Sequence, residues 1–279
     1  MLVRLISGVI LLAVLLFVIV TNGPVLAVFT LIISVLGFSE LIKACGVRAK
    51  DEKVALPEIV GYAGIAAFDF LMLFCPQFFE RYSMLVIILT IMGMQLCYVL
   101  TFPRYKASQI MAGAFSFLYA PVLLSYIYQT RNLQGGQYLV WLIFCASWGC
   151  DTCAYVVGML IGKHKLAPVL SPKKSIEGSV GGVVGAVLIG LIYAKCVLAF
   201  LPASGLSPDI IWIFPVIGAA GSVLSQCGDL AASGIKRDHD IKDYANLIPG
   251  HGGIMDRFDS VIVTAPLIYY LALILLANR

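Results

Sequence analysis

The chain has 279 residues, of which 61% are hydrophobic and only 12% are charged. Its mean hydropathy of +0.97 excludes an ordinary soluble domain, which does not need so much apolar surface. The net charge of +4 says little as a total, whereas its distribution along the chain is informative. Apolar runs longer than the roughly 20 residues needed to cross the hydrocarbon core predict an all-α polytopic membrane protein.

The apolar runs between polar breaks predict nine membrane spans. Arg4 followed by an apolar core resembles a signal peptide, but the core is long and the next run begins directly after Pro24. We therefore expect an uncleaved first helix. The predicted spans are 3–21, 24–44, 57–76, 83–102, 108–129, 137–160, 179–202, 209–232 and 258–278.

Lysine and arginine are distributed unequally between the two sides that these spans define. With the N-terminus in the cytoplasm, only Arg81, Arg131 and Arg279 lie outside, and Lys195 can snorkel from the outer end of its span. The positive-inside rule therefore supports an odd number of helices, a cytoplasmic N-terminus and an outer C-terminus. The inner side holds Arg4, Lys43, Arg48, Lys50, Lys53, Arg104, Lys106, Lys163, Lys165, Lys173, Lys174, Lys236, Arg237, Lys242 and Arg257.

We expect one integral membrane domain with two regions. Residues 1–135 supply about five transmembrane helices, and residues 136–279 form a catalytic region with cytoplasmic loops at 162–178 and 234–257. These loops are too short to fold independently. The absence of a repeat period weakens an inverted-repeat transporter interpretation.

The segment from Ser233 to Asp259 concentrates charge of both signs, glycine and histidine between apolar runs. Such a segment at one membrane border indicates a charged, phosphate-like substrate. Within it, Pro249-Gly250-His251-Gly252-Gly253 lets backbone N–H groups approach an anion, next to the positive end of the following helix. His251 is placed to donate to a phosphate oxygen.

Several carboxylates lie in or beside the spans. An ionised carboxylate in hydrocarbon costs roughly 2.5 kcal/mol or more, so Asp69, Asp151 and Asp229 should face a wet cavity, a cation or a metal. Asp256 and Asp259 are three residues apart and project to one helix face. We expect Asp229 to meet Asp256, forming an oxygen-rich site that suits magnesium.

The loop at 162–178 also concentrates charged residues and glycine, like the segment from Ser233 to Asp259. Its lysines can pair with a triphosphate or with anionic lipid headgroups, although a purely topological role is the alternative. No GxxxxGK[ST] phosphate loop is present in the chain. The Cys150-Asp151-Thr152-Cys153 motif has redox or zinc spacing but no second pair, so we interpret these cysteines as small apolar residues.

The charged segment resembles the signature of the phosphatidate cytidylyltransferase family, also called CDP-diacylglycerol synthases. That signature reads Ser233-Gly-Ile-Lys236-Arg237, then Lys242-Asp243, then His251-Gly-Gly-Ile-Met-Asp256-Arg257-Phe-Asp259. Upstream, Asp151-Thr152, Gly162-Lys163 and Ser171-Pro172-Lys173-Lys174-Ser175 also look like the family. The resemblance covers the C-terminal half closely, and the N-terminal helices match in character.

The resemblance implies transfer of CMP from CTP to phosphatidic acid, giving CDP-diacylglycerol and pyrophosphate, with Mg²⁺ and a second, monovalent cation as candidate cofactors. It implies a catalytic set of Asp229, Asp256, Lys236, Arg237, His251 and Arg257. The implied substrate-binding set is Lys173, Lys174, Ser175, Ser233, Lys242, Asp243, Gly250, Gly252 and Gly253. The implied metal ligands are Asp229 and Asp256, with Asp259 and Asp151 as further candidates.

The expected partners are CTP, phosphatidic acid and membrane lipids, with no nucleic acid, and a homodimer is plausible for a helical membrane enzyme. We expect a bacterial inner membrane location with the active site on the cytoplasmic side. Two other functions stay open: a CTP-dependent lipid kinase, which releases CDP, and a transporter whose buried acids line a pathway. A CDP-alcohol phosphotransferase is disfavoured because its DGxxAR…GxxxDxxxD pattern is missing.

Overall fold

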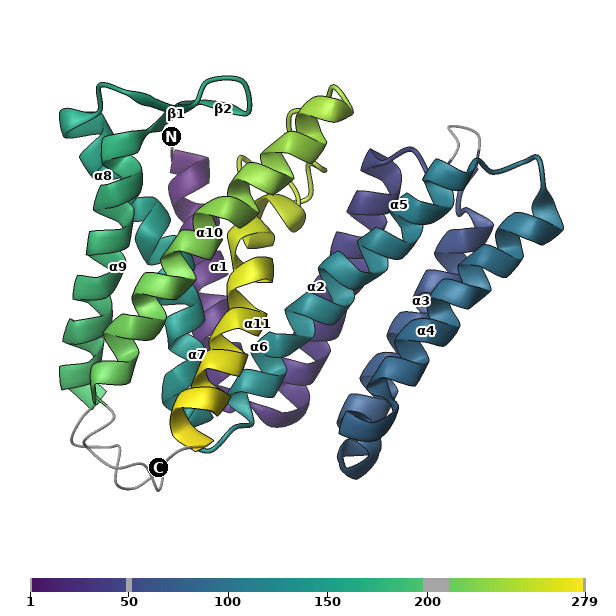
Figure 1. The fold of residues 1–279 in the computed structure, drawn as a ribbon, viewed down its shortest axis with the longest axis horizontal. Helices are drawn as coiled ribbons and strands as arrows, with labels where there is room; N and C mark the ends of the chain where they lie inside the picture. The colour runs from purple at the N-terminus through teal and green to yellow at the C-terminus, as the bar shows by residue number, and fades with distance from the viewer. Residues whose placement is uncertain (1, 49–51, 198–210, 278–279) are drawn as a thin grey trace. The chain divides into compact units, whose positions relative to one another are not determined.

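The computed structural model describes residues 2–48, 52–197 and 211–277, and these are almost entirely helical (Figure 1). The first four helices are α1 (Leu2–Thr21), α2 (Gly23–Ala44), α3 (Leu56–Phe74) and α4 (Pro76–Thr101). Two further rods each contain a wider π-helical turn. The first is α5 (Ala107–Phe117), η1 (Leu118–Val122) and α6 (Leu123–Arg131), and the second is α7 (Gly136–Phe144), η2 (Cys145–Gly149) and α8 (Cys150–Ile161).

The remaining elements are the strands β1 (Lys165–Ala167) and β2 (Ser171–Ser175) and the helices α9 (Ile176–Val197), α10 (Ile213–Asp238) and α11 (Met255–Ala277). Eight helices of the described chain are long and apolar enough to cross a membrane. In α1, side chains are described only over Ile6–Thr21, and this apolar segment is shorter than those eight helices. The structure thus confirms an all-α polytopic membrane protein, with a helix at each of the nine predicted spans.

Several predicted boundaries differ from the observed ones, by about two helical turns at most. Helix α4 begins at Pro76 instead of residue 83, because the exposed Glu80 and Arg81 are carried on the helix. Helix α10 continues past residue 232 to Asp238, and α11 begins at Met255. The predicted loop at 234–257 is therefore shorter than expected, since its charged ends continue the helices.

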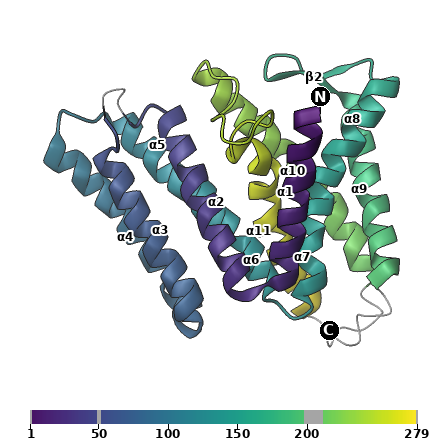
Figure 2. The same cartoon turned by 180° about the vertical axis from the view of Figure 1, so that it is seen from behind.

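By backbone packing the chain forms two compact units. The first comprises residues 1–125 and 239–256, and the second comprises residues 126–238 and 257–279. In the first, α3 and α4 lie side by side in both views (Figures 1 and 2). Glycine permits this approach, because a Cβ at Gly64 would come within 2.4 Å of Thr90 on α4. The core of this unit contains the buried side chains of Phe38, Ile42, Met94 and Phe117.

In the second unit, small residues let α8, α9 and α10 approach closely. A Cβ at Gly190 would lie 3.2 Å from the carbonyl oxygen of Phe214, and one at Gly218 would lie 3.1 Å from that of Ala186. Both positions lie between α9 and α10, where an added Cβ would force the neighbouring backbone to give by a few tenths of an ångström. Between α8 and α9, a Cβ at Gly185 would lie 2.4 Å from Cys153 Sγ. Helices α8 and α10 therefore both pack closely against α9.

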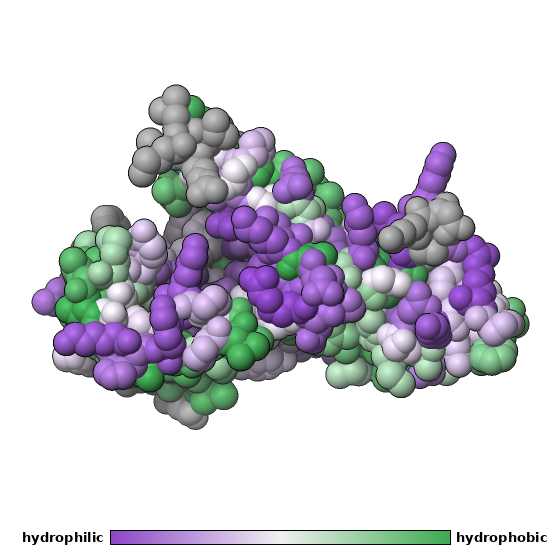
Figure 3. Space-filling view, turned by 90° about the horizontal axis from the view of Figure 1, so that it is seen from above, coloured by the Kyte–Doolittle hydropathy of each residue, from purple (hydrophilic) through white to green (hydrophobic). Residues whose placement is uncertain are grey.

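The loop predicted at 162–178 contains a short antiparallel hairpin. Strands β1 and β2 pair Lys165 with Ser175 and Ala167 with Ser171. Glu177 fixes the start of the hairpin by accepting hydrogen bonds from the backbone N–H groups of Lys163 (3.0 Å) and His164 (3.2 Å). Figure 3 looks onto the end of the helices at which the hairpin lies, and hydrophilic side chains gather on this face.

Candidate active site

The second unit places a lysine against one of the predicted catalytic acids. Lys174 on β2 forms an ion pair with Asp229 on α10, and each side chain is about a quarter exposed. The hairpin, which the sequence did not reveal as a folded element, therefore brings its lysine onto the acid of a transmembrane helix. This pair is the centre of the candidate site.

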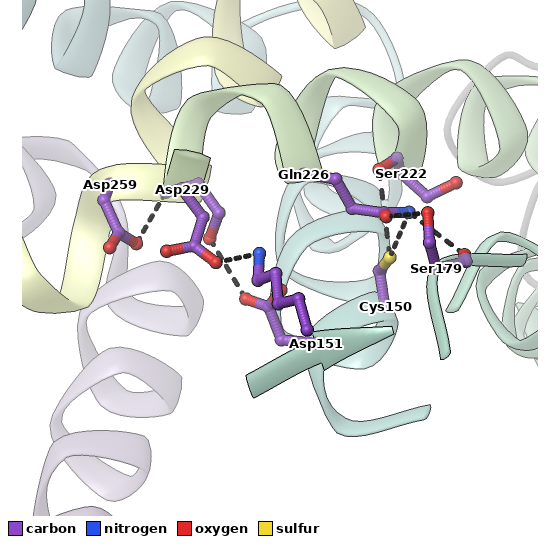
Figure 4. Close-up of polar contacts among 9 residues, drawn as sticks. Cys150, Asp151, Ser179, Ser222, Gln226, Asp229 and Asp259 are labelled. Atoms are coloured by element: carbon purple, nitrogen blue, oxygen red, sulfur yellow. Dashed lines mark hydrogen bonds and ion pairs between the residues drawn. The ribbon is translucent and has the colours of Figure 1, made fainter. Parts of the chain in front are cut away.

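Two more acids lie close to Asp229 in the same unit. Figure 4 shows Asp259, Asp229 and Asp151 in a row, contributed by α11, α10 and α8. The carboxylate of Asp229 is near enough to repel those of Asp151 and Asp259, while Lys174 attracts Asp151 and Lys236 attracts Asp259. The row thus gathers three acids, and the cationic side chains of Lys174, Lys236 and Arg257 act on it.

Ser260 links two of these acids. Its hydroxyl lies 3.4 Å from Asp151 Oδ2, and its backbone N–H donates to Asp259 Oδ1 at 2.8 Å. Helix α11 can come this close to α10 because Gly228 faces it: a Cβ there would be 2.8 Å from the carbonyl oxygen of Asp259.

A cavity of about 420 Å³ opens beside the ion pair. Its wall includes the charged residues Asp151, Lys173 and Asp229 and the apolar side chains of Tyr155 and Met159. A cavity with this mixed lining suits a ligand that combines a charged group with an apolar chain. Its other lining residues are Ala154, Gly158, Leu166, Lys174, Ser175, Gly178, Ser179 and Gln226.

Gln226 on α10, which lines the cavity, is the centre of a hydrogen-bond network (Figure 4). Gln226 accepts a hydrogen bond from the Ser179 hydroxyl, and its amide donates to the Ser179 carbonyl (3.2 Å) and to Cys150 Sγ (3.5 Å). Cys150 is buried, and neither it nor Cys153 is in a disulfide. Cys150 thus takes part in the hydrogen-bond network of Gln226, beyond the role of a small apolar residue that the sequence suggested.

The predicted cationic residues of the signature take different positions. Ser233, Lys236 and Arg237 lie in the last turns of α10, on the helix and not in the loop. The backbone carbonyl of Arg257 accepts a hydrogen bond from Trp148 Nε1 at 3.1 Å, which ties the start of α11 to η2. Lys173 is exposed beside Lys174, and Ser175 caps the backbone N–H of Gly178 at 3.1 Å.

The glycine-rich part of the signature belongs to the first unit, where it forms a tight loop. Gly250 and Gly252 have positive φ values of 76° and 82°, and Ile248 pairs with Gly252. Asp256 Oδ2 accepts hydrogen bonds from the backbone N–H groups of Tyr244 (2.9 Å) and Gly253 (3.0 Å). Because a Cβ at Gly252 would lie 2.7 Å from Asp256 Oδ2, glycine is required there. Lys242 and Asp243 are exposed on the same loop.

His251 is held by the first helix. Its Nδ1 lies 3.1 Å from the hydroxyl of Ser7, which also donates to the carbonyl oxygen of Pro249 at 2.9 Å. Gly8 lies next to the imidazole, since a Cβ there would be 3.8 Å from the ring, an ordinary van der Waals distance. The sequence offered no signal for this contact, because Ser7 is an ordinary polar residue 244 positions away.

Glu40 is a site-adjacent residue that sequence reasoning missed. It lies on α2, is 7% exposed, and accepts hydrogen bonds from the backbone N–H groups of Ile254 (2.9 Å) and Met255 (2.8 Å). These are among the N–H groups that a helix start leaves without intrahelical partners. The available signal was an acid inside the apolar run 24–44.

The predicted site residues thus divide between two clusters. The second unit brings together Asp151, Asp229 and Asp259, and the first unit holds Asp256 and His251 in the signature loop. The meeting of Asp229 with Asp256 stays a prediction. Over the described ranges no three His, Cys, Asp or Glu side chains form a ready-made metal site.

Comparison with known proteins decides the family. The model of the cytidylyltransferase family matches residues 2–275 of the chain. The chain belongs to the cytidylyltransferase family. It is accordingly an enzyme, a nucleotidyltransferase that uses CTP.

Individual members of this family align over nearly the whole chain. A phosphatidate cytidylyltransferase of Bacillus subtilis is 34% identical over 263 residues, covering 89% of this chain and 93% of that protein. One from Staphylococcus saprophyticus is 31% identical over 270 residues, covering 95% and 96%. The resemblance drawn from the signature residues is therefore confirmed across both halves of the chain.

Proposed function

We propose that the protein transfers CMP from CTP to phosphatidic acid, forming CDP-diacylglycerol and releasing pyrophosphate. The relatives that align over 95% and 89% of the chain carry the name of this activity. The observation that supports it within this chain is the cavity at the Lys174–Asp229 pair, whose wall combines charged and apolar residues. A phospholipid likewise combines a charged phosphate head with apolar acyl chains.

In the proposed reaction a phosphate oxygen of phosphatidic acid forms a bond to the α-phosphorus of CTP. The bond between the α-phosphorus and the bridging oxygen breaks, and pyrophosphate leaves with the electron pair. The attacking oxygen already carries negative charge, so the protein's main tasks are to position the two phosphates and to offset their charge. Lys173 and Lys174 are the cations nearest the cavity for that purpose.

We include a magnesium ion in this proposal, held by Asp229 with Asp151 and Asp259 beside it and with Asp256 as a further ligand. The residues fit such an ion in kind, because carboxylate oxygens are the donors that it prefers and three of them repel one another here. The Lys174 ammonium, paired with Asp229, supplies the positive charge that this region requires. When bound, the metal would neutralise phosphate charge as the α-phosphorus is attacked.

The apolar residues that line the cavity can contact the acyl chains. Tyr155 and Met159 are both largely exposed along α8, next to the lining residues Ala154 and Gly158. An acyl chain can lie along this face while its phosphate reaches Lys174. We propose a bacterial cytoplasmic membrane location, with this site on the cytoplasmic side, in line with the excess of lysine and arginine in the loops of that side.

The test is magnesium-dependent release of pyrophosphate from CTP by the purified full-length protein in lipid nanodiscs, with and without phosphatidic acid. The proposal expects release only when phosphatidic acid, CTP and magnesium are all present, with CDP-diacylglycerol recovered in the lipid fraction. Release of CDP together with a newly phosphorylated lipid would replace it with the lipid kinase. Transfer that survives complete chelation of divalent ions would remove the metal from the mechanism.

A further inference from the structure

A second cavity lies in the first unit, among residues that the reaction does not use. Its volume of about 520 Å³ is within the range of sites for small molecules. Two residues of α2 and seven of α3 line it: Leu31, Val35, Tyr62, Ile65, Ala66, Asp69, Phe70, Leu73 and Phe74.

Asp69 is the feature of this cavity that requires explanation. Its side chain is only 6% exposed, and its Oδ2 has no hydrogen-bond partner within the part of the chain that the structure describes. A carboxylate buried among apolar side chains is costly unless an opposite charge or a hydrogen bond stabilises it. The sequence predicted that Asp69 faces a wet cavity, a cation or a metal, and the described residues of the protein supply no hydrogen-bond partner at this oxygen.

The other polar group in the wall is already engaged. The Tyr62 hydroxyl donates to Glu58 Oε1 at 2.7 Å, and Glu58 also receives the guanidinium of Arg48. Asp69 is therefore the lining residue whose bonding capacity is available to a ligand. The rest of the wall, including Phe70 and Phe74, offers only apolar contact.

The position of the cavity along α3 suits a ligand with a polar head. Asp69 lies five residues before Phe74, the last residue of α3, which places it about 7.5 Å from the helix end at the usual rise per residue. Charged and exposed Glu80 and Arg81 follow in the early turns of α4. A head group at Asp69 is thus less than two helical turns from the polar end of the α3–α4 hairpin.

We propose that this cavity binds a cationic amphiphile, a primary ammonium group on a single alkyl chain. The ammonium pairs with the Asp69 carboxylate, and the chain lies along Phe70, Leu73 and Phe74. A cation fits better than an alcohol because a full opposite charge is what stabilises an ionised carboxylate in apolar surroundings. The site is separate from the cytidylyl-transfer residues and does not depend on that function.

The experiment uses the full-length protein in phosphatidylcholine nanodiscs and dodecylamine carrying a photoreactive diazirine on its chain. After illumination, mass spectrometry locates the labelled residues. The proposal expects saturable labelling on the peptides that contain residues 31–35 and 65–74, displaced by unlabelled dodecylamine. The same probe with a hydroxyl in place of the amine should label these peptides at least about tenfold less, since it forms no ion pair.

Two variants test the assignment to this cavity. Asp69→Asn removes the charge at nearly constant shape and should lower labelling about tenfold or more. Ala66→Phe fills the cavity from an exposed position, leaves Asp69 in place, and should lower labelling as well, so it decides the question if the first variant does not fold. Glu80→Gln, an exposed acid of α4 outside the cavity, is the matched control and should leave labelling unchanged.

Three results would overturn the proposal. One is equal labelling of the wild-type protein and a folded Asp69→Asn variant, and another is undiminished labelling of Ala66→Phe. The third is an alcohol probe that labels as strongly as the amine. Cytidylyl transfer should be unaffected by Asp69→Asn, so a failure here leaves the proposed enzymatic function untouched.

Discussion

Glu40 on α2 accepts a hydrogen bond at 2.8 Å from the backbone N–H of Met255, the first residue of α11, although 215 positions separate them. The same carboxylate binds the N–H of Ile254, and a Cβ on Gly253 would lie 2.5 Å from it. One buried acid of α2 thus holds the end of the glycine-rich loop, directly before Asp256.

Replacing Glu40 with alanine should therefore damage both stability and activity. Two backbone N–H groups would lose their acceptor in a buried place, at a cost of about 1–3 kcal/mol for each. We expect a clear fall in the detergent-solubilised melting temperature and a loss of transfer activity. Glu40→Gln, which keeps one amide oxygen as an acceptor, should recover part of both. Glu80→Ala, an exposed acid on α4, serves as control, and equal melting temperatures of the two alanine variants would contradict this role.

Asp229→Asn should lower cytidylyl transfer by at least about 100-fold, the size of effect seen when one strong electrostatic contact to a reacting group is removed. The shape of the side chain is kept, so the melting temperature should change little. The rate of pyrophosphate release at saturating CTP measures the effect. Asp238→Asn, an exposed acid at the end of the same helix, is the matched control. A variant at Asp229 that retains most activity would remove it from the reaction.

Variants of His251 and Ser7 distinguish a direct role of the histidine in the reaction from the positioning of its ring by Ser7. If His251 contacts a phosphate, His251→Ala should reduce the rate by about 100-fold or more, as for other proton donors. Ser7→Ala removes only the contact to Nδ1 and to the Pro249 carbonyl, so its effect should be several-fold. Steady-state rates of both variants at varied CTP concentration give the comparison. Equal small losses would show that the histidine serves only to hold the loop.

Gly178→Ala should destabilise the packing of α9 against α8. The added Cβ would lie 2.7 Å from the carbonyl oxygen of Ala154 and 2.9 Å from Ser175 Oγ, so the helices must move apart at a cost of about 1–3 kcal/mol. The melting temperature and the activity should fall together, since Ser175 lines the cavity. Gly113→Ala on α5 meets only ordinary contacts of 3.6 and 3.8 Å and should be neutral. A neutral Gly178→Ala would show that α8 and α9 are less tightly packed than the structure has them.

The helices could be predicted from the sequence because their signal is local. An apolar run of about 20 residues specifies a transmembrane helix without reference to the rest of the chain. The errors arose where charged residues such as Glu80 and Lys236 continue a helix beyond the apolar part. Hydropathy locates the apolar segment. The end of the helix is instead set by the last of its backbone hydrogen bonds, which can lie beyond that segment.

The candidate site was only partly predictable, for a related reason. The acids Asp151, Asp229 and Asp259 stand out because a charge in an apolar run is costly, and the structure brings these three near one another. The pairing of Lys174 with Asp229 depends on a hairpin whose register no hydropathy pattern shows. The contacts of Glu40 and Ser7 join residues more than 200 positions apart and follow only from the three-dimensional packing.

The wide turn Cys145–Gly149 has a consequence for the acid that follows it. Each residue of a regular α-helix advances about 100° around the axis, so a turn that takes in one extra residue changes the rotational phase of everything after it. Wound as an unbroken α-helix, the rod from α7 to α8 would carry Asp151 to another side, away from Ser260. The orientation of this carboxylate is thus set upstream of it, by how the backbone coils between Phe144 and Cys150.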